Sequence, residues 1–113
     1  MAGLPDGMGS QVFYLDALKR SAKMTSHQYD REHVTPHIIN NPELFPSLYL
    51  KAPDNLRYPH IAVTLDEFQD YLLIKKIIEY FSGLNENFGC LDIIKLLNKN
   101  SSWLEINKDV LGN

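Results

Sequence analysis

The longest stretch of helix-spaced apolar residues lies at 67–81, and it limits the possible folds more than any other feature of the chain. Apolar residues recur there at positions 71, 74, 78 and 81, and charged residues at 75, 76 and 79 cover the opposite side. Ser82 and Gly83 follow and are typical of a helix end. The pattern predicts one long amphipathic helix, so the rest of the chain must supply a surface that covers its apolar face.

Three short runs rich in β-branched and aromatic residues predict strands, at residues 11–15, 47–51 and 60–65. Helical patterns predict four further segments, at 17–24, 30–40 (kinked or split at Pro36), 91–98 and 102–105. The expected fold class is α+β: a small mixed or antiparallel sheet of about three strands with several helices. Such a sheet has two edges that need protection.

At 113 residues the chain is expected to form one domain, 1–113, with a modest core that gains from association, so a homodimer is expected. The net charge is −3 and Lys and Arg are scattered, which argues against nucleic acid as a partner. The longest apolar run, at 71–74, is too short to span a membrane. A single cysteine and a first segment without signal-peptide character favour the cytoplasm.

The stretch 29–38 (YDREHVTPHI) concentrates ionisable side chains before and after a proline. His33 and His37 have the spacing of helical zinc pairs, but Pro36 lies between them and the other ligands would have to be His27 or His60. A solvated first helical turn explains the charges equally simply. A metal site, a solvated helix and part of a substrate pocket therefore compete.

Motifs for phosphate binding and covalent catalysis are missing from the sequence. No glycine-rich loop is followed by Lys and Ser or Thr, and no Gly-x-Ser-x-Gly elbow is present. Cys90 has no basic neighbour that would lower its pKa. The residues alone therefore assign no catalytic group.

The run 31–38 (REHVTPHI) resembles the REHVTPYI signature of the spore-coat-polysaccharide type of cytidylyltransferase, a relative of the acylneuraminate and 3-deoxy-manno-octulosonate cytidylyltransferases. Three further segments resemble the family's segments in the same order: 5–13 (PDGMGSQVF), 61–70 (IAVTLDEFQD) and 88–97 (FGCLDIIKLL). The resemblance covers nearly the whole chain, which corresponds to the C-terminal portion of the family's domain. It implies part of a nucleotide-diphospho-sugar transferase fold.

By this resemblance, the family couples CTP to an acidic or related sugar, and the nucleotide site belongs to an N-terminal half that is not represented here. The chain alone is therefore expected to be inactive and to hold no cofactor. Magnesium is the family's metal, and Asp66 corresponds to its aspartate ligand. The residues expected on the sugar side are Arg31, Glu32, His33, Gln11 and Asp6.

Departures from the family pattern leave alternatives open. Gly9 and Gln11 replace acidic residues, and Gln11 can bond a sugar hydroxyl but cannot act as a charged ligand. Asp66 either binds magnesium or caps the following helix together with Gln69. The chain is expected to be a sugar-side and dimer-forming fragment, a subunit that completes a separately encoded nucleotide-binding half, or a small interaction domain.

Overall fold

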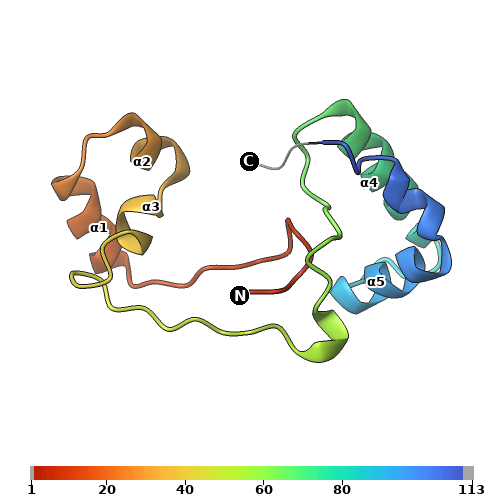
Figure 1. The fold of residues 1–113 in the computed structure, drawn as a ribbon, viewed down its shortest axis with the longest axis horizontal. Coiled ribbons are helices and arrows are strands. Elements are labelled where there is room, and N and C mark those ends of the chain that lie inside the picture. The colour runs from red at the N-terminus through yellow and green to blue at the C-terminus, as the bar shows by residue number, and fades with distance from the viewer. Residues whose placement is uncertain (1, 111–113) are drawn as a thin grey trace. The chain divides into compact units, whose positions relative to one another are not determined.

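The computed structural model describes residues 2–110, and this part of the chain is mostly helical (Figure 1). It contains five α-helices: α1 Leu15–Met24, α2 Gln28–His33, α3 Pro36–Ile39, α4 Phe68–Phe81 and α5 Cys90–Lys99. Two 3-10 helices complete it: η1 Asp54–Leu56 and η2 Ser101–Glu105. No helix in the described part is both long and apolar enough to cross a membrane.

The predicted α+β fold with a three-stranded sheet is wrong. Within residues 2–110 there is no strand, and only two isolated parallel bridges form, Ala2–Lys51 and Asp6–Ala62. β-branched and aromatic residues favour an extended backbone, but a strand exists only where a second backbone takes up its hydrogen bonds. Residues 11–14 and 47–50 are extended without such a partner, and Leu15 joins α1 instead.

The chain divides into two compact units. One unit, here called the core unit, comprises residues 2–9 and 51–110 and contains α4 and α5. The other, here called the motif unit, comprises residues 10–50 and contains α1, α2 and α3.

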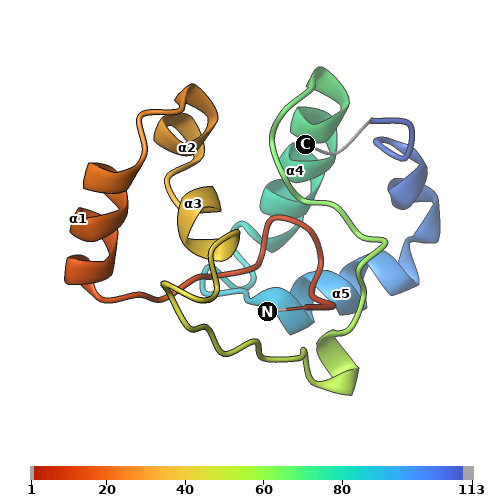
Figure 2. The same ribbon diagram turned by 60° about the vertical axis from the view of Figure 1, so that its left-hand side comes forward.

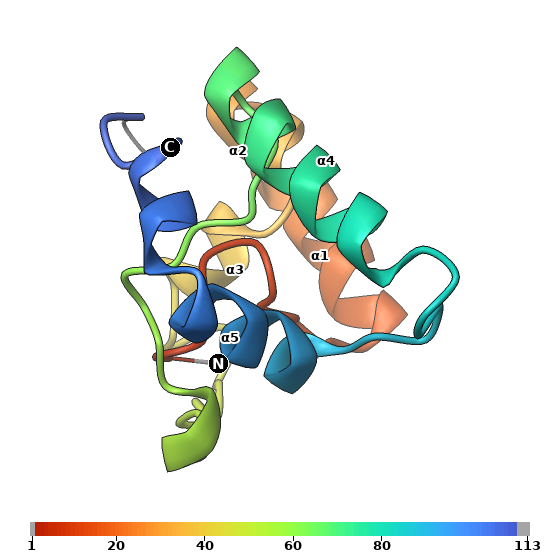
Figure 3. The same cartoon turned by 90° about the vertical axis from the view of Figure 1, so that its right-hand side faces the viewer.

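The hydrophobic cluster of the core unit is built mainly from α4 and α5, which are joined by the loop at residues 82–89 (Figure 3). Its buried members are Ile61, Leu73, Ile77, Phe81, Ile93, Ile94, Leu96 and Leu97. The sequence pattern of α5 predicts Leu91, Ile94 and Leu97 on the inner face; Ile94 and Leu97 are buried, and Leu91 is partly buried. Trp103 packs against the cluster from η2.

The apolar face of α4 was predicted only in part: Phe81 is buried and Ile74 is partly buried, as expected. Tyr71 and Ile78 are exposed, whereas Leu73 and Ile77 are buried. Apolar residues occupy neighbouring positions along this helix, so the spacing permits two overlapping faces. Packing against α5 and the segment at Ile61 selects the face at 73 and 77, which the helix's own sequence does not specify.

The core unit contains a turn at Pro5–Gly7. The N–H of Met8 donates to the carbonyl of Pro5 at 3.1 Å, and Gly7 has a φ of +97°. A Cβ atom added to Gly7 would lie 2.9 Å from the backbone of Val63 and Thr64. Glycine therefore satisfies two demands at once, a left-handed backbone and a close approach to the facing chain.

The motif unit has very few buried residues. Its three helices are short, as Figure 2 shows. Only Ser21, Ile38 and Phe45 are buried among residues 10–50. A unit of roughly 40 residues buries too little surface to be stable without a cross-link or a partner. If this unit folds by itself, its stability therefore depends on a few specific contacts.

Candidate functional site

The signature run 31–38 spans the junction between α2 and α3. The expected helix 30–40 is split at the proline: α2 ends at His33, and α3 begins with Pro36 as its first residue. Proline suits that position because its missing N–H has no helical partner there. His27 caps α2: its Nδ1 accepts from the N–H of Tyr29 at 3.3 Å.

Val34, between the two helices, adopts a strained backbone conformation. Its φ is 73° and its ψ is −52°, and it is the one non-glycine residue with positive φ in the described part of the chain. The N–H of Thr35 donates to the carbonyl of His33 at 2.9 Å and closes a γ-turn over Val34. A β-branched residue in this conformation costs about 1–3 kcal/mol, and such strain concentrates at functional sites.

Arg31 fastens this turn to α1. Its Nη2 donates to the carbonyl of Ala22 at 3.0 Å, in the last turns of α1. The bond satisfies a carbonyl that the end of the helix would otherwise leave to water. Arg31 therefore has a structural task in addition to any contact with a carboxylate.

Gln11 is brought to the signature run by a single contact. The hydroxyl of Thr35 donates to Oε1 of Gln11 at 2.7 Å. The amide nitrogen of Gln11 keeps its two N–H donors, which suit a hydroxyl oxygen. The structure therefore joins two segments that are far apart in the sequence and that both carry expected site residues.

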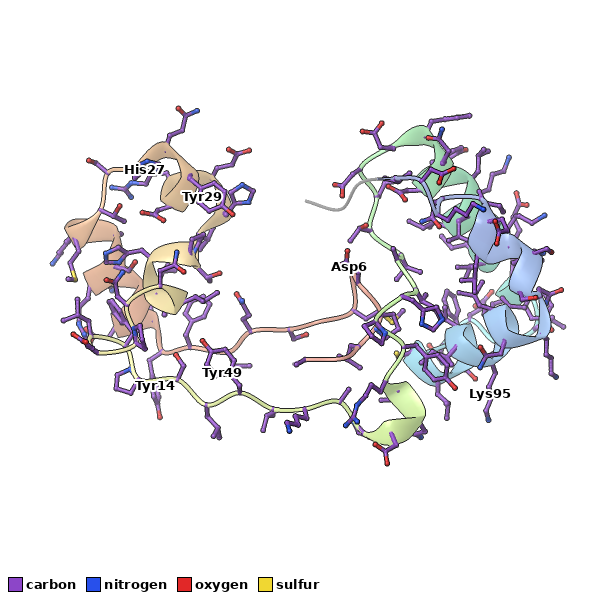
Figure 4. The ribbon with its side chains drawn as sticks, viewed as in Figure 1. Asp6, Tyr14, His27, Tyr29, Tyr49 and Lys95 are labelled. Carbon is purple, nitrogen blue, oxygen red and sulfur yellow. The ribbon has the colours of Figure 1, made fainter. Side chains whose placement is uncertain are left out.

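Glu32 and His33 are exposed at the end of α2. The imidazole of His33 lies against the ring of Tyr29, which Figure 4 labels, with a centroid distance of 4.4 Å. Glu32 makes no hydrogen bond or ion pair within the described part of the protein. These two side chains are therefore available at the strained turn for a polar ligand.

His37 serves the packing of the motif unit. Its Nδ1 and the hydroxyl of Ser21 are hydrogen-bonded at 3.1 Å, and its ring meets the ring of Phe45 edge to face. No group of three or more His, Cys, Asp or Glu residues able to hold a metal ion is found within 2–110. A zinc pair of His33 and His37 is not supported by this arrangement.

Asp6 and Asp66, the other expected site residues, belong to the core unit. The backbone of Asp6, labelled in Figure 4, donates to the carbonyl of Ile61 and accepts from the N–H of Val63, each at 2.8 Å. The Asp6 side chain is exposed. Its backbone is therefore used for structure, and its carboxylate faces solvent.

Asp66 does not cap α4, since Asp70 performs that task. Oδ2 of Asp70 accepts from the N–H groups of Asp66 and Glu67, at 3.1 and 3.0 Å. The expected partnership of Asp66 with Gln69 is absent from the described hydrogen bonds. The Asp66 side chain is exposed just ahead of the helix.

The sequence analysis missed the pair formed by Asp70 and Asn107. Nδ2 of Asn107 donates to Oδ1 of Asp70 at 2.8 Å and to the carbonyl of Ala62 at 3.0 Å. These contacts tie the start of α4 to the chain after η2. The Asn107 bond, with help from the two N–H bonds, lowers the pKa of the Asp70 carboxyl against the opposing effect of burial. The sequence signal that could have predicted the capping role of Asp70 is its position three residues after Glu67, which is the spacing of a capping box.

Two further features of the core unit, a cysteine and an open hollow, bear on its chemistry. Burial raises the pKa of the Cys90 thiol, which disfavours the reactive thiolate. An open hollow at the start of α4 is lined by Glu67, Gln69, Ile106, Asp109 and Val110. Its charged side chains are acidic, so it does not suit the phosphates of a nucleotide.

Comparison with known proteins finds no matching family and no matching solved structure. The chain is 38% identical over 104 residues to the uncharacterized protein MJ1063 of Methanocaldococcus jannaschii, a match that covers 92% of this chain and 42% of the relative. It is 36% identical over 70 residues to the spore coat polysaccharide biosynthesis protein SpsF of Bacillus subtilis, covering 62% of this chain and 29% of SpsF. The chain spans less than half the length of these relatives.

The expected resemblance is confirmed at this coarser level. The chain is similar to a spore coat polysaccharide biosynthesis protein, in agreement with the interpretation of the signature run 31–38. That the match is to a C-terminal portion, and that the family's cytidylyltransferase activity applies, stay predictions.

Proposed function

We propose that this chain is the sugar-binding and assembly portion of a larger sugar cytidylyltransferase-like protein, and that it does not transfer nucleotides by itself. The observation that carries the proposal is the strained turn at Val34, which lies inside the signature run. Strain of this kind persists where the surrounding contacts maintain it, and it is concentrated at ligand sites. The similarity to SpsF supports a role in polysaccharide biosynthesis.

In this proposal the turn presents donors and acceptors to a sugar. Glu32 accepts from hydroxyl groups, and His33 either donates or accepts according to its tautomer. Gln11, held by Thr35, offers amide N–H donors to a further hydroxyl. One N–H group of Arg31 donates to the carbonyl of Ala22, and its other N–H groups are available to the carboxylate of a sugar acid.

Asp66 has an exposed carboxylate of the kind that magnesium prefers, but it belongs to no group of three or more His, Cys, Asp or Glu residues able to hold a metal ion within residues 2–110. The described residues therefore do not make a complete magnesium site. Asp6 lies in the same unit as Asp66, and its expected contact with a sugar stays a prediction outside the site proposed on the motif unit.

Association is part of the proposal because the motif unit buries so little. A second copy of the chain, forming the expected homodimer, and a separately encoded nucleotide-binding half are the two candidates. The similarity to relatives more than twice as long favours a nucleotide-binding half over a second copy, whether that half is encoded with this chain or separately. The alternative of an unrelated interaction domain predicts association without any response to a sugar.

The test is an NMR titration of the chain with N-acetylneuraminate. We expect backbone shifts confined to residues 11 and 31–35, with an affinity in the millimolar range. Glu32→Gln is expected to weaken this binding about tenfold, because a neutral amide accepts hydroxyl hydrogens more weakly than a carboxylate. Glu43→Gln is the matched control, since Glu43 is also an exposed acid of the motif unit.

Two results would contradict the proposal. One is a titration without shifts at saturating sugar. The other is an equal change of binding in Glu32→Gln and Glu43→Gln, which would show that no specific contact of Glu32 with the sugar is involved.

A further inference from the structure

Two contacts decide which side of α2 faces α1. The carboxylate of Asp30 accepts from the hydroxyl of Thr25 at 2.7 Å, and Arg31 donates to the carbonyl of Ala22 at 3.0 Å. Both partners lie at the end of α1. Positions 30 and 31 therefore mark the inward side of α2, and the residues on its other side are not used by this packing.

Tyr29, Glu32 and His33 share the outward side of α2. They are three and four positions apart, which makes them neighbours on a helix. All three are exposed, and Tyr29 is 55% exposed. The rings of Tyr29 and His33 are tilted by 46°, with their centroids 4.4 Å apart, so they overlap only in part. Much of the Tyr29 ring therefore stays uncovered beside a carboxylate and an imidazole.

The fold of the motif unit makes little use of the Tyr29 ring. The phenol hydroxyl has no hydrogen-bond partner within residues 2–110. A tyrosine that serves packing buries its ring and usually finds a partner for its hydroxyl. One ring pair at this spacing adds little to the stability of a helix of six residues. The ring is therefore better suited to contact with a ligand than to support of the fold.

A pyranose ring offers two kinds of surface that match the outward side of α2. Its C–H groups make one face apolar, and its hydroxyl groups project around the edge. The face of an aromatic ring carries partial negative charge, which attracts the weakly positive hydrogens of C–H groups. The carboxylate of Glu32 accepts from hydroxyl groups next to that face. An open-chain sugar acid has the hydroxyl groups but no fixed apolar face.

We propose that Tyr29 stacks against the C–H face of a pyranose ring and thereby selects cyclic sugars at the site on the motif unit. With the sugar held in this way, its hydroxyl groups meet Glu32 and His33 on the same side of α2. This inference rests on the proposed function, because it concerns the same sugar and the same turn. It adds Tyr29 as the residue that orients the sugar ring.

The test compares two sugar acids by NMR titration of the whole chain. N-acetylneuraminate has a pyranose ring, whereas gluconate is an open-chain acid, and both carry a carboxylate and hydroxyl groups. We expect N-acetylneuraminate to bind at least about tenfold more tightly than gluconate. Its ring C–H protons should move upfield, because protons above an aromatic face are shielded. The backbone shifts stay at residues 11 and 31–35, and the side-chain ring resonances of Tyr29 move with them.

Substitutions at position 29 separate the effect of the aromatic ring from that of an apolar side chain. Tyr29→Leu should bind N-acetylneuraminate about tenfold more weakly, lose the upfield shift and leave the response to gluconate unchanged. Tyr29→Phe keeps the ring and should keep the upfield shift. Tyr49→Leu is the matched control and should change neither ligand's binding, since Tyr49 is a tyrosine of the same unit that is 69% exposed and lies outside α2. Unchanged amide resonances in α1 and α3 would show that each variant is folded.

Three results would overturn the inference and leave the proposed function intact. They are equal affinities for the two acids, equal binding of N-acetylneuraminate by Tyr29→Leu and the original chain, and no upfield shift of the sugar protons at saturation. The last is measured on the original chain, so it tests the stacking even if Tyr29→Leu does not fold. No response to either acid would instead contradict the proposed function, and the stacking with it.

Discussion

At the scale of single residues, the signature run 31–38 combines structural and exposed side chains. Arg31 holds the end of α1, and Thr35 holds Gln11. Glu32 and His33 are left exposed beside the strained Val34. The sequence identified the correct stretch but not this division of tasks, because the carbonyl of Ala22 and the amide of Gln11 reach it only through folding.

Val34→Gly tests the strain directly. Glycine adopts a positive φ without a steric penalty, and Val34 buries only part of its side chain. We expect the motif unit to gain about 1 kcal/mol, seen as slower amide exchange in α1 and α3. Val34→Ala is the control, since alanine keeps the positive-φ penalty. A loss of stability in Val34→Gly as large as that in Val34→Ala would contradict strain at this position.

At the scale of elements, helices were more predictable than strands. The helices at 67–81 and 91–98 are present with small shifts of their ends, because their periodicity and end signals are local. The three strands are absent from the described part, because a strand depends on a partner backbone that local sequence cannot supply. The capping alternative for Asp66 is also wrong, because Asp70 caps α4, and the contact that holds Asp70 to Asn107 spans 37 residues.

Asp70→Asn tests the hydrogen bonds that Asp70 accepts at the start of α4. An amide in place of the carboxylate cannot accept from all three donors, so we expect a loss of about 2 kcal/mol in urea unfolding at pH 7. Trp103 fluorescence reports on the core unit that contains it. Asp66→Asn is the matched control, and its effect should stay within about 0.5 kcal/mol. Equal losses in the two variants would return the capping role to Asp66.

The Asp70 carboxylate also makes the stability of the folded protein depend on pH. The pKa of Asp70 is lowered in the folded protein, so the folded state holds its charged form more firmly than the unfolded chain does. The stabilisation is therefore complete above the ordinary carboxyl pKa of about 4 and is lost as the pH falls below it. Urea unfolding from pH 7 to pH 3 should show this loss, and Asp70→Asn should reduce it. If the free energy of unfolding of the variant fell equally steeply with pH, the loss of stability in acid would have to come from other groups.

At the scale of the whole molecule, the two units differ in what they can do alone. The core unit has a continuous apolar cluster around α4 and α5. The motif unit carries the signature run but leaves much of its apolar surface exposed. The resemblance to a polysaccharide biosynthesis protein could be predicted from the sequence, because a short run such as 31–38 is recognisable from its residues and their order alone. The division into two units was not anticipated, because it depends on contacts between distant segments.

A pair of NMR titrations of the isolated chain, one with N-acetylneuraminate and one with CTP and magnesium, tests most directly whether this chain forms the sugar side of a larger protein. We expect shifts at residues 11 and 31–35 with the sugar acid and none of comparable affinity with CTP. Specific shifts with CTP, or a sugar response located elsewhere, would contradict the assignment of this chain to the sugar side of a larger protein.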